Sequence, residues 1–216
     1  MHNIQHVSFP RSGYYITVKC LRGILPGMIH NCEFYNHCRQ TPCTDPKTNY
    51  QKNHDLHLRL KQVPQFHYII QYRHPIESIA SWYNMNLVHA RPIKKMFLSM
   101  MDSEKLFKIF LLQKINFWKR FVQKWIIGNR SNNTHVISYH ELLENPVDVF
   151  LQTAQFIHPL EQVSRSVVEK VVAEQNITIK HQLADFRYYD AVFFGEIEDS
   201  IEEYLRALNL MRVIDN

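Results

Sequence analysis

The sequence has few glycines, and it lacks the two common glycine-rich motifs that bind phosphate. Five glycines occur among 216 residues, and neither G-x-x-x-x-G-K-[ST] nor G-x-G-x-x-G is present. These absences argue against an ordinary kinase of the nucleotide-triphosphate type and against a dinucleotide-dependent dehydrogenase. A linker rich in glycine, serine and proline is also missing, so we expect one domain spanning residues 1–216.

Long uncharged apolar runs are absent as well. The richest apolar stretch, residues 106–127, is interrupted by several lysines and an arginine, which excludes a simple transmembrane span. The N-terminus has no basic region followed by an apolar core and a small-residue cleavage site. We therefore expect no secretory signal and a cytoplasmic location.

Acidic residues are scarce in the first part of the chain. Residues 1–139 carry 19 Lys and Arg against 6 Asp and Glu, a net charge of +13, whereas residues 140–216 carry 6 against 14, a net charge of −8. A basic region of this kind favours an anionic ligand, and nucleotide, nucleic acid, acidic glycan and membrane surface all fit the charge alone.

The first residues have the pattern of a strand, a tight turn and a helix. Residues 4–9 alternate as a strand, residues 14–21 follow as a helix, and the turn between them is Pro10, Arg11, Ser12 and Gly13. Such a junction places backbone N–H groups and the positive end of a helix dipole around one point, beside one arginine. The segment is suited to a phosphate or sulfate group.

Strands and helices continue to alternate along the chain. Residues 66–72 form an apolar strand of the buried parallel type, Pro75 suits the first turn of the next helix, and residues 135–139 form a further short strand. A short extended run is expected at residues 49–51. Apolar residues at intervals of three or four predict a long amphipathic helix over residues 103–127. Residues 27–47 are expected to be an irregular inserted loop, and residues 158–216 to be mainly helical.

Strands alternating with helices predict an α/β fold, a single-domain three-layer α/β/α arrangement with a central parallel sheet. In such sheets ligands bind beyond the carboxyl ends of the strands. The turn at residues 10–13, Arg73 and Tyr139 all follow strands, so we expect them at one edge of the sheet.

The chain resembles sulfotransferases that use 3′-phosphoadenosine 5′-phosphosulfate (PAPS), which have a P-loop-like nucleotide-binding fold. The segment Phe9-Pro10-Arg11-Ser12-Gly13 is similar to that family's 5′-phosphosulfate loop, and Arg73 with Ser81 is similar to its 3′-phosphate motif. Tyr139 is similar to the tyrosine that contacts adenine. The resemblance covers roughly residues 4–157 and implies PAPS as donor, its product PAP, and no required metal; we assign no metal-binding residue.

Lys52-Asn53-His54-Asp55 resembles the Lys-Thr-His segment of the cytosolic members, which implies that His54 is the catalytic base. A sulfuryl acceptor must lose a proton as its new bond to sulfur forms, and histidine accepts protons near neutral pH. Fixed cations lower the barrier as charge develops on the leaving nucleotide, and we assign this role to Arg11 and Lys52. Asp55 either orients the imidazole or caps the following segment.

The sequence departs from the family pattern in two places. Tyr14 and Tyr15 stand where the family has small hydroxyl residues that hold the sulfonate, and Tyr15 or Thr17 is the substitute we consider. The C-terminal Arg-Lys-Gly segment that closes over the 3′-phosphate is absent, and Arg187 is its replacement in our assignment. We therefore interpret the chain as a compact, atypical member.

Four cysteines occur, and three of them lie in the inserted loop, at Cys32, Cys38 and Cys43 with His30 and His37 nearby. Their spacing lacks the C-x₂-C pair typical of zinc knuckles. We expect reduced thiols in a cytosolic chain, with a disulfide and a metal site as open alternatives.

The resemblance implies a sulfotransferase that acts on a hydroxyl or amine of an unidentified carbohydrate, lipid or small-molecule acceptor. The partners are then a nucleotide donor and this acceptor, and nucleic acid is not expected. Two alternatives stay open: a non-catalytic nucleotide-binding protein of the same fold, and an atypical phosphotransferase. The oligomeric state is not predicted.

Overall fold

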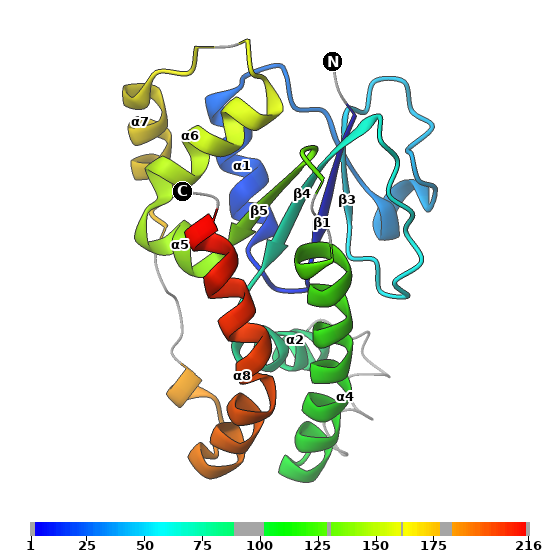
Figure 1. The fold of residues 1–216 in the computed structure, drawn as a ribbon, viewed down its shortest axis with the longest axis vertical. Coiled ribbons are helices and arrows are strands. Elements are labelled where there is room, and N and C mark those ends of the chain that lie inside the picture. The colour runs from blue at the N-terminus through cyan, green and yellow to red at the C-terminus, as the bar shows by residue number, and fades with distance from the viewer. Residues whose placement is uncertain (1–2, 89–101, 129–130, 161, 178–182, 215–216) are drawn as a thin grey trace. The chain divides into compact units, whose positions relative to one another are not determined.

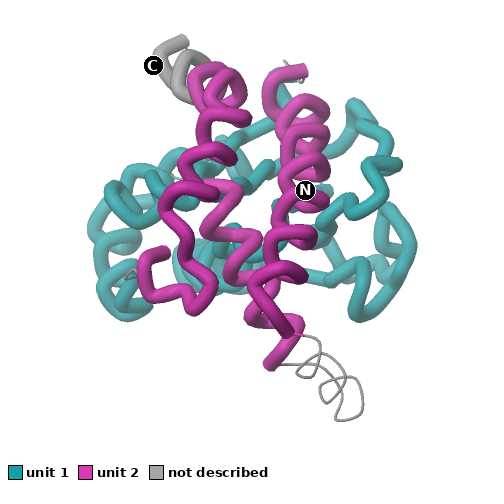
Figure 2. Tube along the Cα trace, turned by 90° about the horizontal axis from the view of Figure 1, so that it is seen from below, with its two compact units in different colours: residues 1–73, 130–179 teal, residues 74–129, 180–216 magenta. Residues whose placement is uncertain are grey.

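The computed structural model describes residues 3–88, 102–128, 131–160, 162–177 and 183–214, with side chains to residue 208 (Figure 1). By its contacts the chain divides into two compact units, which Figure 2 colours separately. Unit 1 comprises Met1–Arg73 and Arg130–Ile179, and unit 2 comprises His74–Asn129 and Lys180–Asn216. Each unit is described by itself.

Unit 1 is built on a five-stranded sheet in which every neighbouring pair is parallel, in the order β2-β3-β1-β4-β5. The strands are β1 (Asn3–Ser8), β2 (Asn31–Glu33), β3 (Tyr50–Asn53), β4 (Phe66–Tyr72) and β5 (Thr134–Ser138). The chain runs from β1 to the outer strand β2, returns to β3 between them, and then crosses to β4 and β5 on the other side of β1. The switch point, where ligands bind in such sheets, is therefore beside β1.

One face of this sheet is covered by helices of the same unit. These are α1 (Tyr14–Ile24), α5 (Tyr139–Glu144), α6 (Pro146–Ile157) and α7 (Arg165–Gln175), and Figure 1 shows α1, α6 and α7 together on one side of the strands. Their buried residues join those of the strands in one apolar cluster that includes Leu21, Ile69, Phe150 and Val168. Burying such side chains contributes roughly 1.5–3 kcal/mol each, which is what holds the helices against the sheet.

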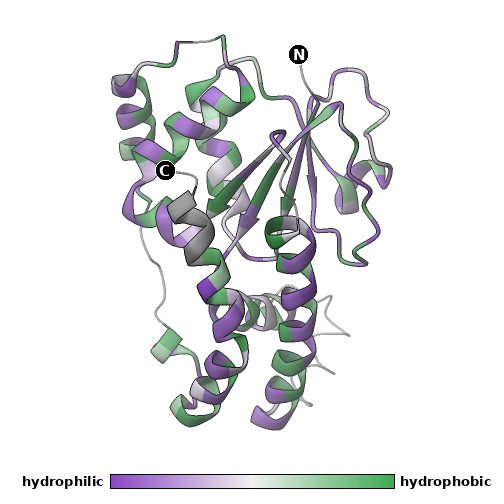
Figure 3. Cartoon of the chain, viewed as in Figure 1, coloured by the Kyte–Doolittle hydropathy of each residue, from purple (hydrophilic) through white to green (hydrophobic). Residues whose placement is uncertain are grey.

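Unit 2 is helical in its described part. It contains α2 (Pro75–Val88), α4 (Glu104–Val122), the π-helical turn η2 (Gln123–Ile127), the 3₁₀ turn η3 (Leu183–Asp185) and α8 (Ala191–Ile214). Ser103 caps α4 by accepting a hydrogen bond from the Leu106 N–H. Polar and apolar colours alternate along α4 in Figure 3, and its apolar stripe, with Phe107 and Trp118, is fully buried.

The predicted α/β fold with a central parallel sheet is confirmed. The predictions were wrong at two local points. The segment 27–47 is not wholly irregular, because it contains β2 and the π-helical turn η1 (Phe34–Cys38). Tyr139 is the first residue of α5 and does not belong to a strand. None of the described helices is long and apolar enough to cross a lipid bilayer.

Candidate functional site

The turn between β1 and α1 presents backbone N–H groups at the switch point. Arg11 and Gly13 have φ angles of 66° and 93°, in the left-handed region, and Gly13 caps α1 without a side-chain hydrogen bond. The N–H groups of Gly13, Tyr14 and Tyr15 have no intrahelical acceptor, since they precede the first turn of hydrogen bonds. The positive end of the α1 dipole lies there too, so the turn has the strand-turn-helix geometry expected of an anion cradle, and anion binding by it is a prediction.

A buried hydroxyl lies within this turn. Ser12 is 1% exposed, and its Oγ has no hydrogen-bond partner among the described residues. Leaving a buried hydroxyl unpaired costs about 1–3 kcal/mol, and such groups are usually explained by a ligand or an ordered water. The Thr17 hydroxyl, by contrast, has a hydrogen-bond partner within the protein: its Oγ1 accepts a hydrogen bond from Nε2 of Gln71 at 2.9 Å. Ser12 fits an anion in the turn, and Thr17 supports the turn from within the fold.

Gly13, Tyr139 and Arg73 come together from three different strand ends. A Cβ atom on Gly13 would lie 2.6 Å from Cδ2 of Tyr139, so only glycine leaves room for that ring. The guanidinium carbon of Arg73 lies 4.5 Å from the centre of the same ring, a cation–π contact. All three residues belong to unit 1, and the expected convergence of the β1, β4 and β5 ends is observed.

Lys52, at the end of β3, is buried beside the same turn. Its Nζ lies 4.3 Å from the centres of both the Tyr14 and the Tyr15 ring and 3.6 Å from Oε2 of Glu33. Burial lowers the pKa of Lys52 and Glu33 raises it again, and the net direction is down. Tyr14 and Tyr15, which replace small hydroxyl residues, therefore form aromatic walls around this ammonium group.

Glu33, the last residue of β2, is a site residue that the sequence reasoning missed. It is 8% exposed, and besides Lys52 its Oε2 accepts hydrogen bonds from the Tyr15 hydroxyl at 3.4 Å and from Nδ2 of Asn36 at 2.5 Å. Parallel pairing of β2 with β3 places Glu33 directly opposite Lys52. No sequence motif marks Glu33 as a site residue, because it meets its partner Lys52 only through the pairing of β2 with β3.

His54 is held in one tautomer by the backbone. Its Nδ1 lies 2.6 Å from the Ser8 carbonyl oxygen, and because a carbonyl only accepts, Nδ1 carries the hydrogen and Nε2 carries the lone pair. Tyr35 stacks on the ring, with centres 6.1 Å apart. Burial is the main cause that lowers the pKa of His54 to about 4, and the neighbouring Lys52 lowers it further. The ring is thus neutral at pH 7 and able to accept a proton at Nε2.

The two roles considered for Asp55 are distinguished by its contacts. Oδ1 of Asp55 accepts a hydrogen bond from the Leu60 N–H at 2.8 Å, while the imidazole of His54 is oriented by the carbonyl of Ser8. Asp55 also has a positive φ of 43°, as residues in tight turns often do. The residue caps the segment that follows it.

Two predicted site residues, Ser81 and Arg187, lie in unit 2. Ser81 is within α2, and Arg187 follows η3. The guanidinium of Arg187 makes an ion pair with Asp102 and lies 4.7 Å from the centre of the Tyr188 ring. Asp102 also accepts a hydrogen bond from the Tyr83 hydroxyl at 2.8 Å, so Arg187 belongs to a polar cluster of unit 2. The assignment of both residues to the nucleotide remains a prediction.

Comparison with known proteins identifies the fold. Neither protein-family models nor curated protein sequences give a match. Among solved structures, the crystal structure of sulfotransferase STF9 from Mycobacterium avium is similar, with a TM-score of 0.52 and 16% sequence identity over 74% of this chain. The match spans 41% of that structure. The chain therefore has a sulfotransferase-like fold, in agreement with the resemblance seen in its motifs.

Proposed function

We propose that this protein transfers a sulfuryl group from PAPS to a hydroxyl or amine of an acceptor molecule. The observation that carries the proposal is the grouping of an anion cradle, a buried lysine and a histidine of fixed tautomer at the switch point of a sulfotransferase-like sheet. An anion cradle alone fits many ligands. The neutral imidazole beside it supplies the proton acceptor that sulfuryl transfer to a hydroxyl requires.

The donor fits the residues present at two places in unit 1. The unpaired Ser12 hydroxyl and the N–H groups of the turn are suited to the 5′-phosphosulfate end. Arg73, with a forked guanidinium suited to phosphate, and the Tyr139 ring beneath it are suited to the 3′-phosphoadenosine end. We propose that Ser81 also binds the 3′-phosphate, as the family motif implies, and that Arg187 replaces the absent Arg-Lys-Gly segment.

The chemistry assigned to this chain's residues is proton acceptance and charge stabilisation. When bound, the donor supplies an activated sulfuryl group. Nε2 of His54 accepts the proton of the attacking hydroxyl or amine, and the negative charge of the sulfonate raises the low pKa of His54 toward neutrality. Arg11 and Lys52 stabilise the charge that develops on the leaving nucleotide. No metal is needed for these steps.

A second candidate, a non-catalytic nucleotide-binding protein, is favoured by two observations. Lys52 is paired with Glu33, and Tyr15 replaces a small hydroxyl residue where the sulfonate is expected. In a catalytic protein the donor must compete with Glu33 for the ammonium group. In a binding protein Lys52 would keep its carboxylate partner, and PAP would bind without any transfer.

The decisive experiment measures transfer of labelled sulfate from PAPS to a panel of carbohydrate, lipid and phenolic acceptors. We expect His54→Ala to reduce turnover by about 10²–10⁴-fold while PAP binding is retained. His57→Ala, a change at an exposed histidine three residues along the chain, is the matched control and should be silent. Full activity in the His54 variant would remove it from the mechanism. Absence of transfer with intact PAP binding would favour the non-catalytic alternative.

Calorimetry with PAP and ATP separates both candidates from a phosphotransferase. The Arg73 and Tyr139 pair favours a nucleotide with a 3′-phosphate, so PAP should bind more tightly than ATP. Preference for ATP would contradict the sulfotransferase proposal and support the phosphotransferase. We further propose that the protein acts in the cytoplasm, where PAPS would be its nucleotide partner.

A further inference from the structure

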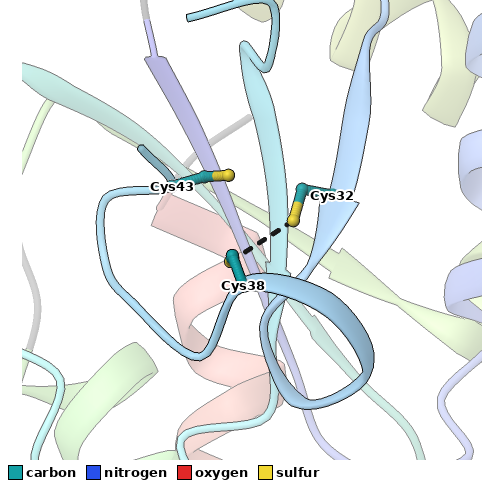
Figure 4. Close-up of side chains that lie close together, drawn as sticks. All are labelled: Cys32, Cys38 and Cys43. Carbon is teal, nitrogen blue, oxygen red and sulfur yellow. Dashed lines mark hydrogen bonds between the residues drawn. The ribbon is translucent and has the colours of Figure 1, made fainter. Parts of the chain in front are cut away.

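Three cysteine thiols converge beside the sheet, outside the site described above. Cys32 lies in β2, Cys38 ends η1, and Cys43 lies in the loop that follows. Their Sγ atoms are all within 4.8 Å of one another, and none is in a disulfide. Figure 4 shows the three side chains turned toward one another. The Sγ atoms of Cys32 and Cys38 are 3.3 Å apart. A loop predicted to be irregular thus folds so that its three cysteines meet.

The spacing of the three sulfurs matches a thiolate metal site. With zinc–sulfur bonds of about 2.3 Å, sulfurs at the corners of a tetrahedron lie about 3.8 Å apart. The observed group has one separation of 3.3 Å and all others within 4.8 Å, so small side-chain shifts bring all three onto one ion. A disulfide would use two of these thiols and leave the third without a role.

Packing alone does not explain the cluster. Cysteine is commonly a small core residue, and Cys20 in α1, which is 0% exposed, is an example within this chain. Cys32 is 7% exposed in β2, but Cys38, at the end of η1, and Cys43, in the loop that follows, are partly exposed. Two partly exposed thiols that gather on a buried third fit a shared ligand better than they fit core packing.

Gln51, a buried residue of β3, donates a hydrogen bond to one sulfur of the cluster. Nε2 of Gln51 donates to Sγ of Cys38 at 3.0 Å and to the Gln40 carbonyl at 2.6 Å, and Gln51 is 2% exposed. N–H donors to ligand sulfurs orient them and partly neutralise their charge. Among the described residues no other cysteine, histidine or carboxylate joins the group, which leaves a fourth position for solvent.

We propose that Cys32, Cys38 and Cys43 bind one Zn²⁺ ion as thiolates, with a water molecule as fourth ligand. Each thiol loses one proton as its sulfur–zinc bond forms, and no oxidant or reductant is involved. The inference does not depend on the proposed sulfotransferase activity. Cys32 directly precedes Glu33, and the β2–β3 register places Cys32 opposite Gln51 and Glu33 opposite Lys52. The ion therefore has a structural role: it fixes the short strand β2 and with it the Glu33 carboxylate.

The test begins with the full chain purified under reducing conditions without chelator. Elemental analysis should give one zinc per chain, and replacement by Co²⁺ should give the sulfur-to-cobalt charge-transfer band and the intense d–d bands of tetrahedral coordination. Cys32→Ser, Cys38→Ser and Cys43→Ser should each lose most of the metal. Cys20→Ala is the matched control, because it removes the cysteine outside the cluster, and it should retain the metal.

A second measurement covers the case in which the serine variants do not fold. Titration of the folded wild-type chain with an organomercurial should release one zinc as three thiols react, as followed with a metal indicator dye. Absence of zinc and of cobalt–sulfur bands in the reduced wild-type chain would overturn the proposal. So would metal content that is unchanged in Cys43→Ser, or a Cys32–Cys38 disulfide found by mass spectrometry in the protein as isolated.

Discussion

Lys52 and Glu33 form a buried ion pair, with Nζ 3.6 Å from Oε2 and both side chains about one-tenth exposed. The pair joins two neighbouring parallel strands and lies against the rings of Tyr14 and Tyr15. Removing one partner leaves an uncompensated charge in a poorly hydrated place, and this has a larger cost than losing an exposed pair. Lys52, the only cationic residue of β3, is thus held by a carboxylate beside the turn between β1 and α1.

The first prediction concerns this pair. A double-mutant cycle with Lys52→Met and Glu33→Gln should give a coupling free energy of unfolding of about 1–3 kcal/mol. The exposed pair Arg165 and Glu169, four residues apart on α7, is the control, and its coupling should not exceed about 0.5 kcal/mol. Glu33→Gln should also tighten PAP binding by about 3–10-fold, since a carboxylate that opposes an anion is removed. Equal coupling in the two cycles would show that burial does not strengthen the Lys52 pair.

The second prediction compares two glycines of positive φ. Gly13 and Gly27 have φ angles of 93° and 74°, but a Cβ atom meets the Tyr139 ring at 2.6 Å in the first and nothing within 4 Å in the second. Gly27→Ala should cost about 1 kcal/mol from backbone strain alone, and Gly13→Ala should cost at least about 1 kcal/mol more. Denaturant unfolding measures both.

The clash itself can be isolated by removing the ring. In a cycle that combines Gly13→Ala with Tyr139→Ala, the double variant should be more stable than the sum of the single changes implies. Additive effects would show that the Tyr139 ring does not restrict the residue at position 13. Other residues would then have to hold the ring against Arg73.

Much of the sheet could be predicted because most of its strands have a recognisable pattern of apolar residues. The bounds of β4 match residues 66–72 as predicted, since a strand buried on both faces reads as a continuous apolar run. Strand β2 could not be found this way, because it has three residues and no apolar alternation. Its stability comes from pairing with β3, which lies elsewhere in the sequence.

The residues of the candidate site also fall into those that the sequence pattern predicts and those that depend on strand pairing or turns. Gly13, Arg73 and Tyr139 were predictable because the carboxyl ends of parallel strands share one edge. Glu33 and the Ser8 carbonyl were not, since each acquires its role from a partner brought near by strand pairing or by a turn. Ser81 and Arg187 lie in unit 2, and their roles as phosphate ligands are still predictions: Ser81 is assigned by the motif, and Arg187 as the replacement for the absent Arg-Lys-Gly segment.

The third prediction separates a ligand-binding hydroxyl from a structural one. Ser12→Ala removes a buried Oγ that has no partner among the described residues, so the free energy of unfolding should stay the same or rise. The same change should weaken PAP binding by about 10-fold, the loss of one hydrogen bond to an anion. Thr17→Val is the matched control: it deprives Gln71 of a buried partner and should cost about 1–3 kcal/mol. A strongly destabilised Ser12 variant would indicate a structural partner for its hydroxyl.

The fourth prediction concerns stability in acid. His6 is fully buried, its Nδ1 lies 2.5 Å from the Tyr50 hydroxyl, and burial is the main cause that lowers its pKa from 6.5 to about 3. Burial also lowers the pKa values of His54 and His135 to about 4. Between these values and 6.5 the unfolded chain binds protons that the folded chain does not. The part of the stability that depends on these neutral histidines is therefore fully present above pH 6.5, and it is lost as the pH falls toward about 4 for His54 and His135 and toward about 3 for His6.

The slope of this loss identifies the histidine responsible. Each such group contributes up to about 1.4 kcal/mol per pH unit between its two pKa values. His6→Gln should therefore flatten the pH dependence of the unfolding free energy between pH 6 and pH 4 by about that amount per pH unit. His57→Gln, at an exposed position, should leave the slope as it is in the wild-type chain. An unchanged slope in the His6 variant would mean that the His6 imidazole becomes protonated within the folded protein, and that the contact with Tyr50 does not require its neutral form.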